Sequence, residues 1–153
     1  MKLIIPMAGR GSRLRPHTFT TAKPLVKIAG KSILAQLIKD AVKMIDEPVE
    51  EMAFIVGDES FFGDQIIQEL KLLAKKYNSI ATIYRQLNPL GTGHAIMCAE
   101  KSLSGKALII YPDTLIKTNE PFDKEEDAVI WTKEVENPVA YGVVKLIEKG
   151  NVT

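Results

Sequence analysis

Short, continuous apolar runs alternate along this chain with longer segments in which apolar residues recur every three or four positions. The short runs predict buried strands, because they are too short to be helices. They cover residues 2–7, 52–56, 80–85 and 107–111. The longer segments have the spacing of helices with one buried face. They cover residues 32–45, 60–77 and 93–102. The predicted order is therefore β-α-β-α-β-α-β.

This alternation predicts an α/β fold of the Rossmann-like, doubly wound type, with a mostly parallel sheet and helices on both faces. Parallel strands need crossover connections, and strands that are apolar on both sides need cover on both faces. Ligands of such sheets bind outside the carboxyl ends of the strands. The loops after the first, third and fourth predicted strands are therefore expected to lie at one edge.

The pattern changes after Asp113. Residues 128–135 and 141–147 are strand-like with no helix between them, so we expect them to extend the sheet or to build a small accessory β region. Residues 149–151 then predict a turn, and residues 152–153 begin a strand that has no room to form. We therefore expect a truncated chain, the N-terminal part of a single domain.

The composition is that of one globular domain with a proper core, at 46% hydrophobic and 25% charged residues. A net charge of +1 argues against nucleic acid as a partner. One cysteine excludes an internal disulfide, and two histidines argue against a zinc cage. No apolar run approaches the roughly 18 residues of a membrane span, so we expect a cytoplasmic protein that does not bind membranes.

A glycine-rich, basic segment follows the first predicted strand and allows several interpretations. A dinucleotide-binding fingerprint needs a third glycine where Leu14 stands. A Walker motif, suggested by Gly30-Lys31-Ser32, needs its first glycine where Leu25 stands, so that stretch is better explained as a turn that caps the next helix. A solvated basic surface loop is the plainest alternative.

The remaining interpretation is a triphosphate-binding loop. Glycines let backbone N–H groups approach a triphosphate without an intervening side chain, and fixed cations offset the charge that develops in nucleotidyl transfer. The segment is Gly9-Arg10-Gly11-Ser12-Arg13-Leu14-Arg15-Pro16, followed by Lys23-Pro24-Leu25. It resembles the signature of the sugar-1-phosphate nucleotidyltransferases, in which G-x-G-[ST]-R-[LM]-x-P precedes a lysine and a proline. The family includes thymidylyl- and uridyltransferases.

Three further segments carry the same resemblance, in the same order. Arg85-Gln86 with Leu90-Gly91-Thr92-Gly93-His94-Ala95 is similar to the segment that recognises a pyrimidine base. Tyr111-Pro112-Asp113 is similar to the element whose aspartate binds the catalytic magnesium, although Pro112 stands where the family has glycine. Glu136-Asn137-Pro138 with Tyr141-Gly142 is similar to the segment that contacts the sugar.

The resemblance implies roles for particular residues. Arg13 would bind the leaving pyrophosphate, Lys23 would stabilise the α-phosphate and the incoming sugar phosphate, and Asp113 would hold Mg²⁺. The residues implied in nucleotide binding are Ala8, Gly9, Gly11, Ser12, Gln86, Gly91 and Thr92. Those implied in sugar binding are Tyr141 and Gly142. His94 is expected to be a cap or packing residue, His17 incidental, and Cys98 part of the core.

The implied reaction transfers a nucleotidyl group from a nucleoside triphosphate, UTP or dTTP, to a sugar 1-phosphate. Residues 1–113 would be the nucleotide-binding core and residues 114–153 the start of the sugar-binding region. A catalytically weak regulatory homologue that binds a nucleotide or a sugar phosphate is the alternative. The sequence identifies neither the sugar nor the oligomeric state, and a homo-oligomer stays open.

Overall fold

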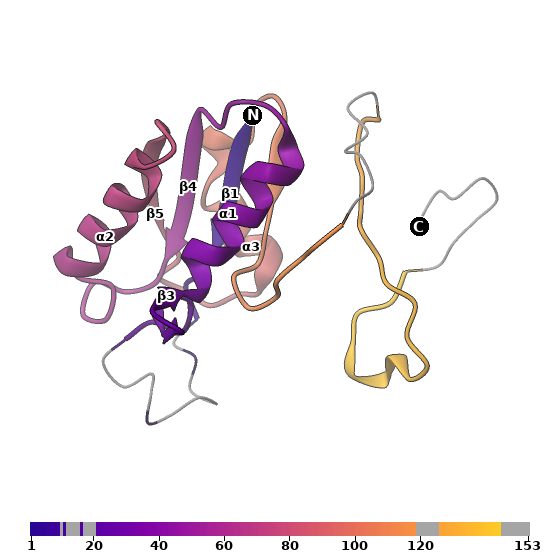
Figure 1. Ribbon diagram of the computed structural model, residues 1–153. Helices are drawn as coiled ribbons and strands as arrows, with labels where there is room; N and C mark the ends of the chain where they lie inside the picture. Colours follow the sequence, from indigo (N-terminus) through magenta and orange to yellow (C-terminus); the bar gives the residue numbers. More distant parts are fainter. Residues whose placement is uncertain (10, 12–15, 17–20, 119–125, 145–153) are drawn as a thin grey trace. The chain divides into compact units, whose positions relative to one another are not determined.

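The computed structural model describes residues 1–9, 11, 16, 21–118 and 126–144 (Figure 1). The chain divides into two compact units, Met1–Pro121 and Phe122–Thr153. No helix in the described part of the chain is both long enough and apolar enough to cross a membrane.

The first unit is built on a four-stranded parallel sheet with the spatial order β5-β4-β1-β6. Its strands are β1 (Lys2–Pro6), β4 (Glu51–Val56), β5 (Ile80–Arg85) and β6 (Ala107–Ile109). The chain thus builds outward from β1 to β4 and β5, and then crosses back to place β6 on the other side of β1. The predicted element order and the parallel sheet are confirmed.

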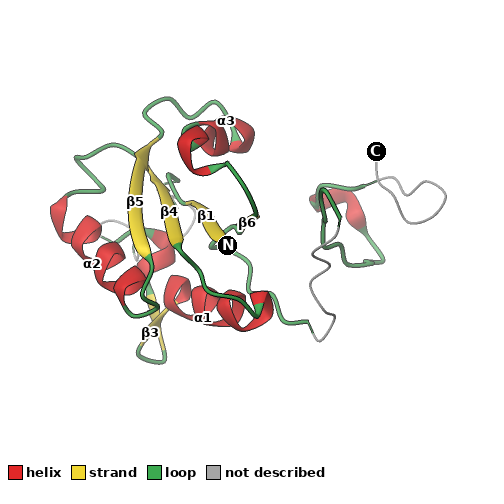
Figure 2. Ribbon diagram, turned by 90° about the horizontal axis from the view of Figure 1, so that it is seen from above, coloured by secondary structure: helices red, strands yellow, loops and turns green. Residues whose placement is uncertain are grey.

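Helices cover both faces of this sheet, as the doubly wound pattern requires. In Figure 2, α1 (Ile33–Ile45) and α2 (Asp64–Lys75) lie on one face, and α3 (Thr92–Met97) lies on the other. A short 3-10 turn, η3 (Glu100–Ser102), follows α3. The change of face accompanies the change of direction in strand order, because the crossover from β5 to β6 runs over the opposite side of the sheet.

The core follows the alternation of side chains along the strands. Ile4, Ala53 and Ile55 are fully buried. They pack with Ala95 of α3 and with Ala99, which follows that helix. The intervening strand residues face the side covered by α1 and α2 and are also fully buried. They are Leu3, Ile5, Met52, Phe54 and Val56. Strands that are buried on both faces explain why the runs in the sequence are continuous and not alternating.

A small hairpin leads into the first helix. Strands β2 (Lys27–Ile28) and β3 (Lys31–Ser32) are antiparallel, and the two residues between them, Ala29 and Gly30, have φ of 50° and 80°. Two left-handed residues in a two-residue loop are typical of a type I′ hairpin turn. The Ser32 hydroxyl then accepts a hydrogen bond from the Ala35 backbone N–H at 3.1 Å. The predicted turn and helix cap at Gly30-Lys31-Ser32 are therefore confirmed.

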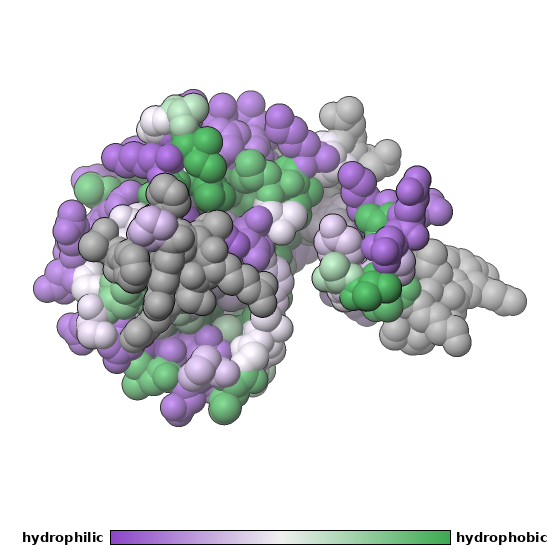
Figure 3. All heavy atoms as spheres, turned by 90° about the horizontal axis from the view of Figure 1, so that it is seen from below, coloured by the Kyte–Doolittle hydropathy of each residue, from purple (hydrophilic) through white to green (hydrophobic). Residues whose placement is uncertain are grey.

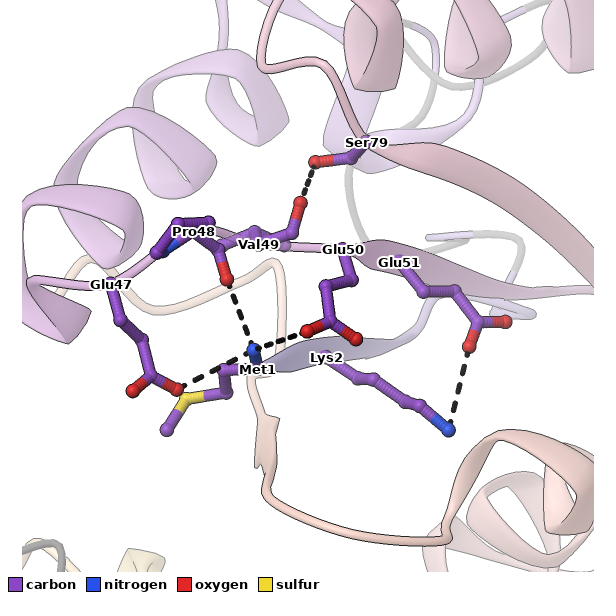
Figure 4. A network of polar contacts seen from close by, with 8 residues as sticks. All are labelled: Met1, Lys2, Glu47, Pro48, Val49, Glu50, Glu51 and Ser79. Atoms are coloured by element: carbon purple, nitrogen blue, oxygen red, sulfur yellow. Dashed lines mark hydrogen bonds and ion pairs between the residues drawn. The ribbon is translucent and has the colours of Figure 1, made fainter.

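The amino ends of the strands are joined by a polar network (Figure 4). The Met1 ammonium donates to the Pro48 carbonyl at 3.0 Å and lies 3.4 Å from a carboxylate oxygen of Glu47. Beside it, Lys2 Nζ lies 3.8 Å from a carboxylate oxygen of Glu51, which pairs β1 with β4 through side chains as well as backbone. Opposite charges at this edge thus help to align the two strands.

Several predicted boundaries are wrong by a few residues. The second helix begins at Asp64 instead of residue 60, because the Ser60, Phe61 and Phe62 N–H groups donate to Asp58 in a tight turn. The predicted helix over 93–102 is divided into α3 and η3. The fourth strand ends at Ile109 instead of residue 111, although the Ile110 N–H still donates to the Ile4 carbonyl at 3.0 Å.

The two strands expected in the second unit are not observed among its described residues. Residues 128–135 are predominantly exposed and form no strand, and neither do residues 141–144; residues 145–147 lie outside the described part. A β-strand exists only where another strand supplies hydrogen-bond partners. The described residues of this unit offer no such ladder, and their one regular element is the 3-10 turn η4 (Pro138–Ala140).

The carboxyl ends of β1 and β4 approach each other closely at Gly57. The Met7 N–H donates to the Ile55 carbonyl at 2.8 Å, so the two segments stay paired beyond the end of β1. A Cβ added to Gly57 would lie 2.9 Å from the Ala8 carbonyl oxygen and 3.1 Å from the Phe62 ring. A side chain at position 57 would therefore displace the backbone at the start of the glycine-rich segment.

We predict that Gly57→Ala lowers the free energy of unfolding by about 1–3 kcal/mol, because the added methyl group overpacks a backbone contact. Urea denaturation checks this. Gly93→Ala is the matched control, since a Cβ there meets nothing within 4 Å and alanine favours the helix in which Gly93 lies. Equal losses of stability in the two variants would contradict the close approach.

Candidate functional site

The candidate site lies at the carboxyl edge of the sheet, where β1 and β6 are neighbours. The carboxyl ends of neighbouring parallel strands lie side by side, so the segments that follow β1 and β6 start close together. Met7, Ala8 and Gly9 follow β1, and the segment from Ile110 to Asp113 follows β6. In Figure 3, which views the molecule from below, hydrophilic side chains and separate hydrophobic patches share the described part of the first unit's surface.

Lys23 stands at this edge on a firmly anchored turn. It is the first residue of the 3-10 turn η2 (Lys23–Leu25). The other two residues of the turn, Pro24 and Leu25, are buried, and so is Ala22 before it. The Leu25 N–H donates to the Ala22 carbonyl at 2.8 Å, and Pro24 restricts the backbone further. The backbone of Lys23 is therefore held by packing, while a third of its side chain remains exposed.

Asp113 meets Lys23 at this edge. The Lys23 Nζ lies 3.7 Å from Asp113 Oδ2, and the two side chains are 33% and 56% exposed. A pair this open to solvent adds little to stability, because water and salt screen it. Its significance is geometric: the structure brings together a cation and a carboxylate that the sequence predicted from segments 90 residues apart.

Gln86 and the glycine loop form the next part of the edge, beyond β5. Gln86 is 9% exposed, and its backbone N–H donates to the Val56 carbonyl at 2.8 Å. Its side-chain Nε2 donates to the Gly91 carbonyl at 3.0 Å. Gly91 has a φ of 107°, which residues with a side chain rarely adopt, and it is followed by exposed Thr92. Gln86 and Gly91 are thus in direct contact.

His94 is the residue of this region that the sequence analysis assigned differently. Its Nδ1 lies 3.1 Å from the Gln86 Nε2, so the half-buried ring is bound to a predicted base-recognition residue. The sequence offered only a weak signal, a histidine eight residues after Gln86 and directly beyond the glycine loop. Its position within the first turn of α3 brings it back toward Gln86, at the end of β5.

Arg85 also has a defined position that the sequence did not predict. Its Nη1 donates to the Gly57 carbonyl at 2.9 Å, and its Nη2 donates to the Phe62 carbonyl at 3.3 Å. These bonds tie the end of β5 to the loop after β4. Arg85 therefore supports the edge beside Gln86 from within.

Other predicted site residues are only partly described. Ala8 is half-buried and Gly9 exposed, and Gly11 has a φ of 63°, where glycine is favoured. Arg13 and Ser12 lie outside the described residues. Tyr141 and Gly142 belong to the second unit and are exposed. The structure therefore brings Lys23 to Asp113 and Gln86 to Gly91, and leaves the others as predictions.

The residues at this edge fit a cation that takes most of its ligands from phosphate and water. Among the described residues, no three histidine, cysteine, aspartate or glutamate side chains gather to form a cage. Asp113 offers one carboxylate, and the Thr114 hydroxyl donates to its Oδ1 at 3.2 Å. Magnesium at phosphate sites commonly uses one or two carboxylates and completes its shell with phosphate oxygens and water. A single exposed carboxylate beside Lys23 matches that donor set.

Comparison with known proteins adds independent information. The family described as "Nucleotidyl transferase" matches residues 2–153. The nucleotidyltransferase Agl11 of low-salt glycan biosynthesis in Haloferax volcanii is 33% identical over 160 residues, 100% of this chain and 43% of its own length. The bifunctional protein GlmU of Methanococcus maripaludis is 31% identical, over 95% of this chain and 33% of its length.

Solved structures agree with the sequence relatives. UDP-glucose pyrophosphorylase complexed with UDP-glucose is similar with a TM-score of 0.58 and 26% identity, over 78% of this chain and 48% of that one. The chain spans from a third to about half of the lengths of these proteins. The parallel sheet, the motifs and the match over nearly every residue lead to one conclusion: the chain belongs to the nucleotidyl transferase family.

Proposed function

We propose that the protein transfers a nucleotidyl group from a pyrimidine nucleoside triphosphate, UTP or dTTP, to a sugar 1-phosphate. The observation that carries this proposal is the pairing of Lys23 with Asp113 at 3.7 Å, where the segments that follow the neighbouring strands β1 and β6 meet. The names of the similar proteins, a nucleotidyltransferase of glycan biosynthesis and a UDP-glucose pyrophosphorylase, support the same class of reaction. The product would be a nucleotide sugar.

In this reaction, a phosphate oxygen of the sugar 1-phosphate attacks the α-phosphorus of the nucleoside triphosphate. A new P–O bond forms, the bond between the α-phosphorus and the bridging oxygen breaks, and pyrophosphate leaves with that oxygen and its electron pair. The attacking oxygen is already anionic, so no side-chain nucleophile is needed. Catalysis then depends on positioning and on the neutralisation of phosphate charge.

Lys23 supplies a fixed positive charge for the α-phosphate and the incoming sugar phosphate. Its anchored backbone limits the entropy lost when the side chain engages a ligand. Arg13 would bind the leaving pyrophosphate, as a guanidinium can hold two phosphate oxygens at once. The backbone of Ala8, Gly9, Gly11 and Ser12 would hold the phosphates of the nucleotide, since glycines there allow close approach.

Asp113 is the residue that would hold Mg²⁺. When bound, the ion would neutralise charge on the phosphate oxygens and orient them. Lys23 lies 3.7 Å from the Asp113 carboxylate, so the same residue that would bind the ion lies beside the proposed cation of the site. In this proposal, Asp113 offers its carboxylate to the cation, and Lys23 beside it offers its charge to the phosphates.

The two parts of the chain would bind different substrates. Residues 1–113 would form the nucleotide-binding core, and residues 114–153 would begin the sugar-binding region, with Tyr141 and Gly142 in contact with the sugar. The single cysteine favours the cytoplasm as the compartment.

Replacing Lys23 or Asp113 tests the assignment of roles. In the full-length protein with Mg²⁺, we predict that Lys23→Gln and Asp113→Asn each lower kcat for pyrophosphate release by about 10²–10³, the cost of losing one preorganised electrostatic contact. The double variant should lose less than the product of the two, because both residues act on the same transition state. A coupled pyrophosphate assay measures all three.

Lys27→Gln is the matched control for the lysine, because it removes the same charge from an exposed residue of the neighbouring hairpin. We expect it to keep full activity. Circular dichroism establishes that each variant is folded. Unchanged turnover in Lys23→Gln or Asp113→Asn would remove that residue from the proposed machinery.

The requirement for an acceptor tests the reaction class. We predict that pyrophosphate appears from UTP or dTTP only when a sugar 1-phosphate is added, because that phosphate is the nucleophile. Mass spectrometry should find a nucleotide sugar in equal amount. Pyrophosphate released with a nucleoside monophosphate in the absence of sugar would indicate hydrolysis instead. Tight nucleotide binding without any product would favour the regulatory homologue.

A further inference from the structure

The orientation of the Gln86 side-chain amide is determined by its neighbours. The atom of this amide that faces the Gly91 carbonyl oxygen lies 3.0 Å from it. A carbonyl oxygen can only accept a hydrogen bond, so the facing atom must be the nitrogen Nε2 and cannot be the oxygen. Gly91 itself has a φ of 107°, so the position of this carbonyl depends on a glycine at that place.

The same nitrogen also identifies the tautomer of His94. The Gln86 Nε2 lies 3.1 Å from His94 Nδ1, and an amide nitrogen offers only donors. Nδ1 must therefore accept, which places the ring proton of the neutral imidazole on Nε2. Both hydrogens of the Gln86 amide are then used inside the protein, one toward Gly91 and one toward His94.

The oxygen Oε1 is the part of the Gln86 side chain that remains for a ligand. The structure records no partner for it among the described residues. No buried side-chain nitrogen or oxygen in that part of the chain lacks a hydrogen-bond partner, so Oε1 reaches the solvent-accessible surface. Only 9% of the surface of Gln86 is exposed, so most of the residue is enclosed while Oε1 remains accessible.

We propose that His94 is a positioning residue for nucleotide recognition. It holds the Gln86 amide so that Oε1 faces the base and accepts a hydrogen bond from N3–H of uracil or thymine. This inference rests on the proposed function and adds to it the atom that reads the base and the residue that orients it. Cytosine has no hydrogen on N3, so the same oxygen would face a lone pair.

The contact with His94 matters because the side-chain amide of an unrestrained glutamine can rotate by 180°. A rotation of 180° would present the amide nitrogen to the ligand, which would pair with N3 of cytosine but would face N3–H of uracil with a second donor. With the ring proton of His94 on Nε2, the rotation would place Oε1 against two acceptors, the Gly91 carbonyl and His94 Nδ1. It would lose both hydrogen bonds, so the acceptor-outward orientation is retained.

Two variants of His94 separate positioning from packing. We expect the wild-type protein to bind UTP at least about tenfold more tightly than CTP, the scale of one unpaired polar group in an enclosed site. His94→Leu retains an apolar side chain but removes the acceptor, and should lower this preference severalfold, because only the Gly91 carbonyl then holds the amide. His94→Asn offers a side-chain oxygen near the position of Nδ1 and should retain most of it. Isothermal titration calorimetry of the full-length protein with UTP and with CTP measures each ratio.

A second measurement needs no nucleotide. Two-dimensional ¹H–¹⁵N spectra of the histidine ring in the wild-type protein should show a protonated Nε2 and an unprotonated Nδ1 for His94. This result does not depend on whether His94→Leu folds. A proton on Nδ1 would overturn the inference, because that nitrogen could then accept nothing from Gln86.

The titrations also distinguish failure of this inference from failure of the proposed function. A wild-type preference for UTP that persists unchanged in His94→Leu overturns the positioning role and leaves the proposed function intact. A wild-type preference for CTP overturns the assignment of Oε1 to N3–H. Wild-type protein that binds neither nucleotide contradicts the proposed function itself, and the base readout with it.

Discussion

The parallel pairing of β1 with both β4 and β6 is the constraint on which the candidate site depends. Hydrogen bonds on its two sides place β1 inside the sheet and make β6 its neighbour, although 100 residues separate these strands in the chain. The segments that follow the two strands therefore meet, and Lys23 reaches Asp113. Without β6 beside β1, the same basic loop would be a surface feature with no carboxylate opposite to it.

Side chains and backbone groups that do not meet the ligand hold this edge in shape. The absence of a side chain at Gly57 lets the Ala8 carbonyl come close, and Arg85 binds the Gly57 and Phe62 carbonyls from the end of β5. Buried Ala22 and Leu25 hold the turn that carries Lys23. Lys23 thus stands on an anchored turn, the arrangement that precise electrostatic catalysis needs.

Local patterns predicted the first unit well, because its strands are continuous apolar runs and its helices have clear buried faces. The strand Ile80–Arg85 has the bounds that the sequence predicts, and Ser32 caps the first helix as expected. The start of α2 was misplaced because Asp58 organises a turn through its own side chain and carbonyl, which competes with the helix. The strands expected at 128–135 and 141–147 did not appear where the chain is described, since a strand depends on a partner that local pattern cannot supply.

The sequence by itself determined the fold class, the family, and the presence of both a glycine-rich basic loop and an aspartate after a buried strand. These features are local, because they follow from periodicity, turn chemistry and motifs of adjacent residues. Only the tertiary structure decided which groups touch: that Lys23 lies against Asp113, and that the Gln86 amide is oriented by Gly91 and His94. The physical reason is that hydrogen bonds and ion pairs depend on distances of a few ångströms between side chains, and strand order and loop geometry set those distances across gaps in the sequence.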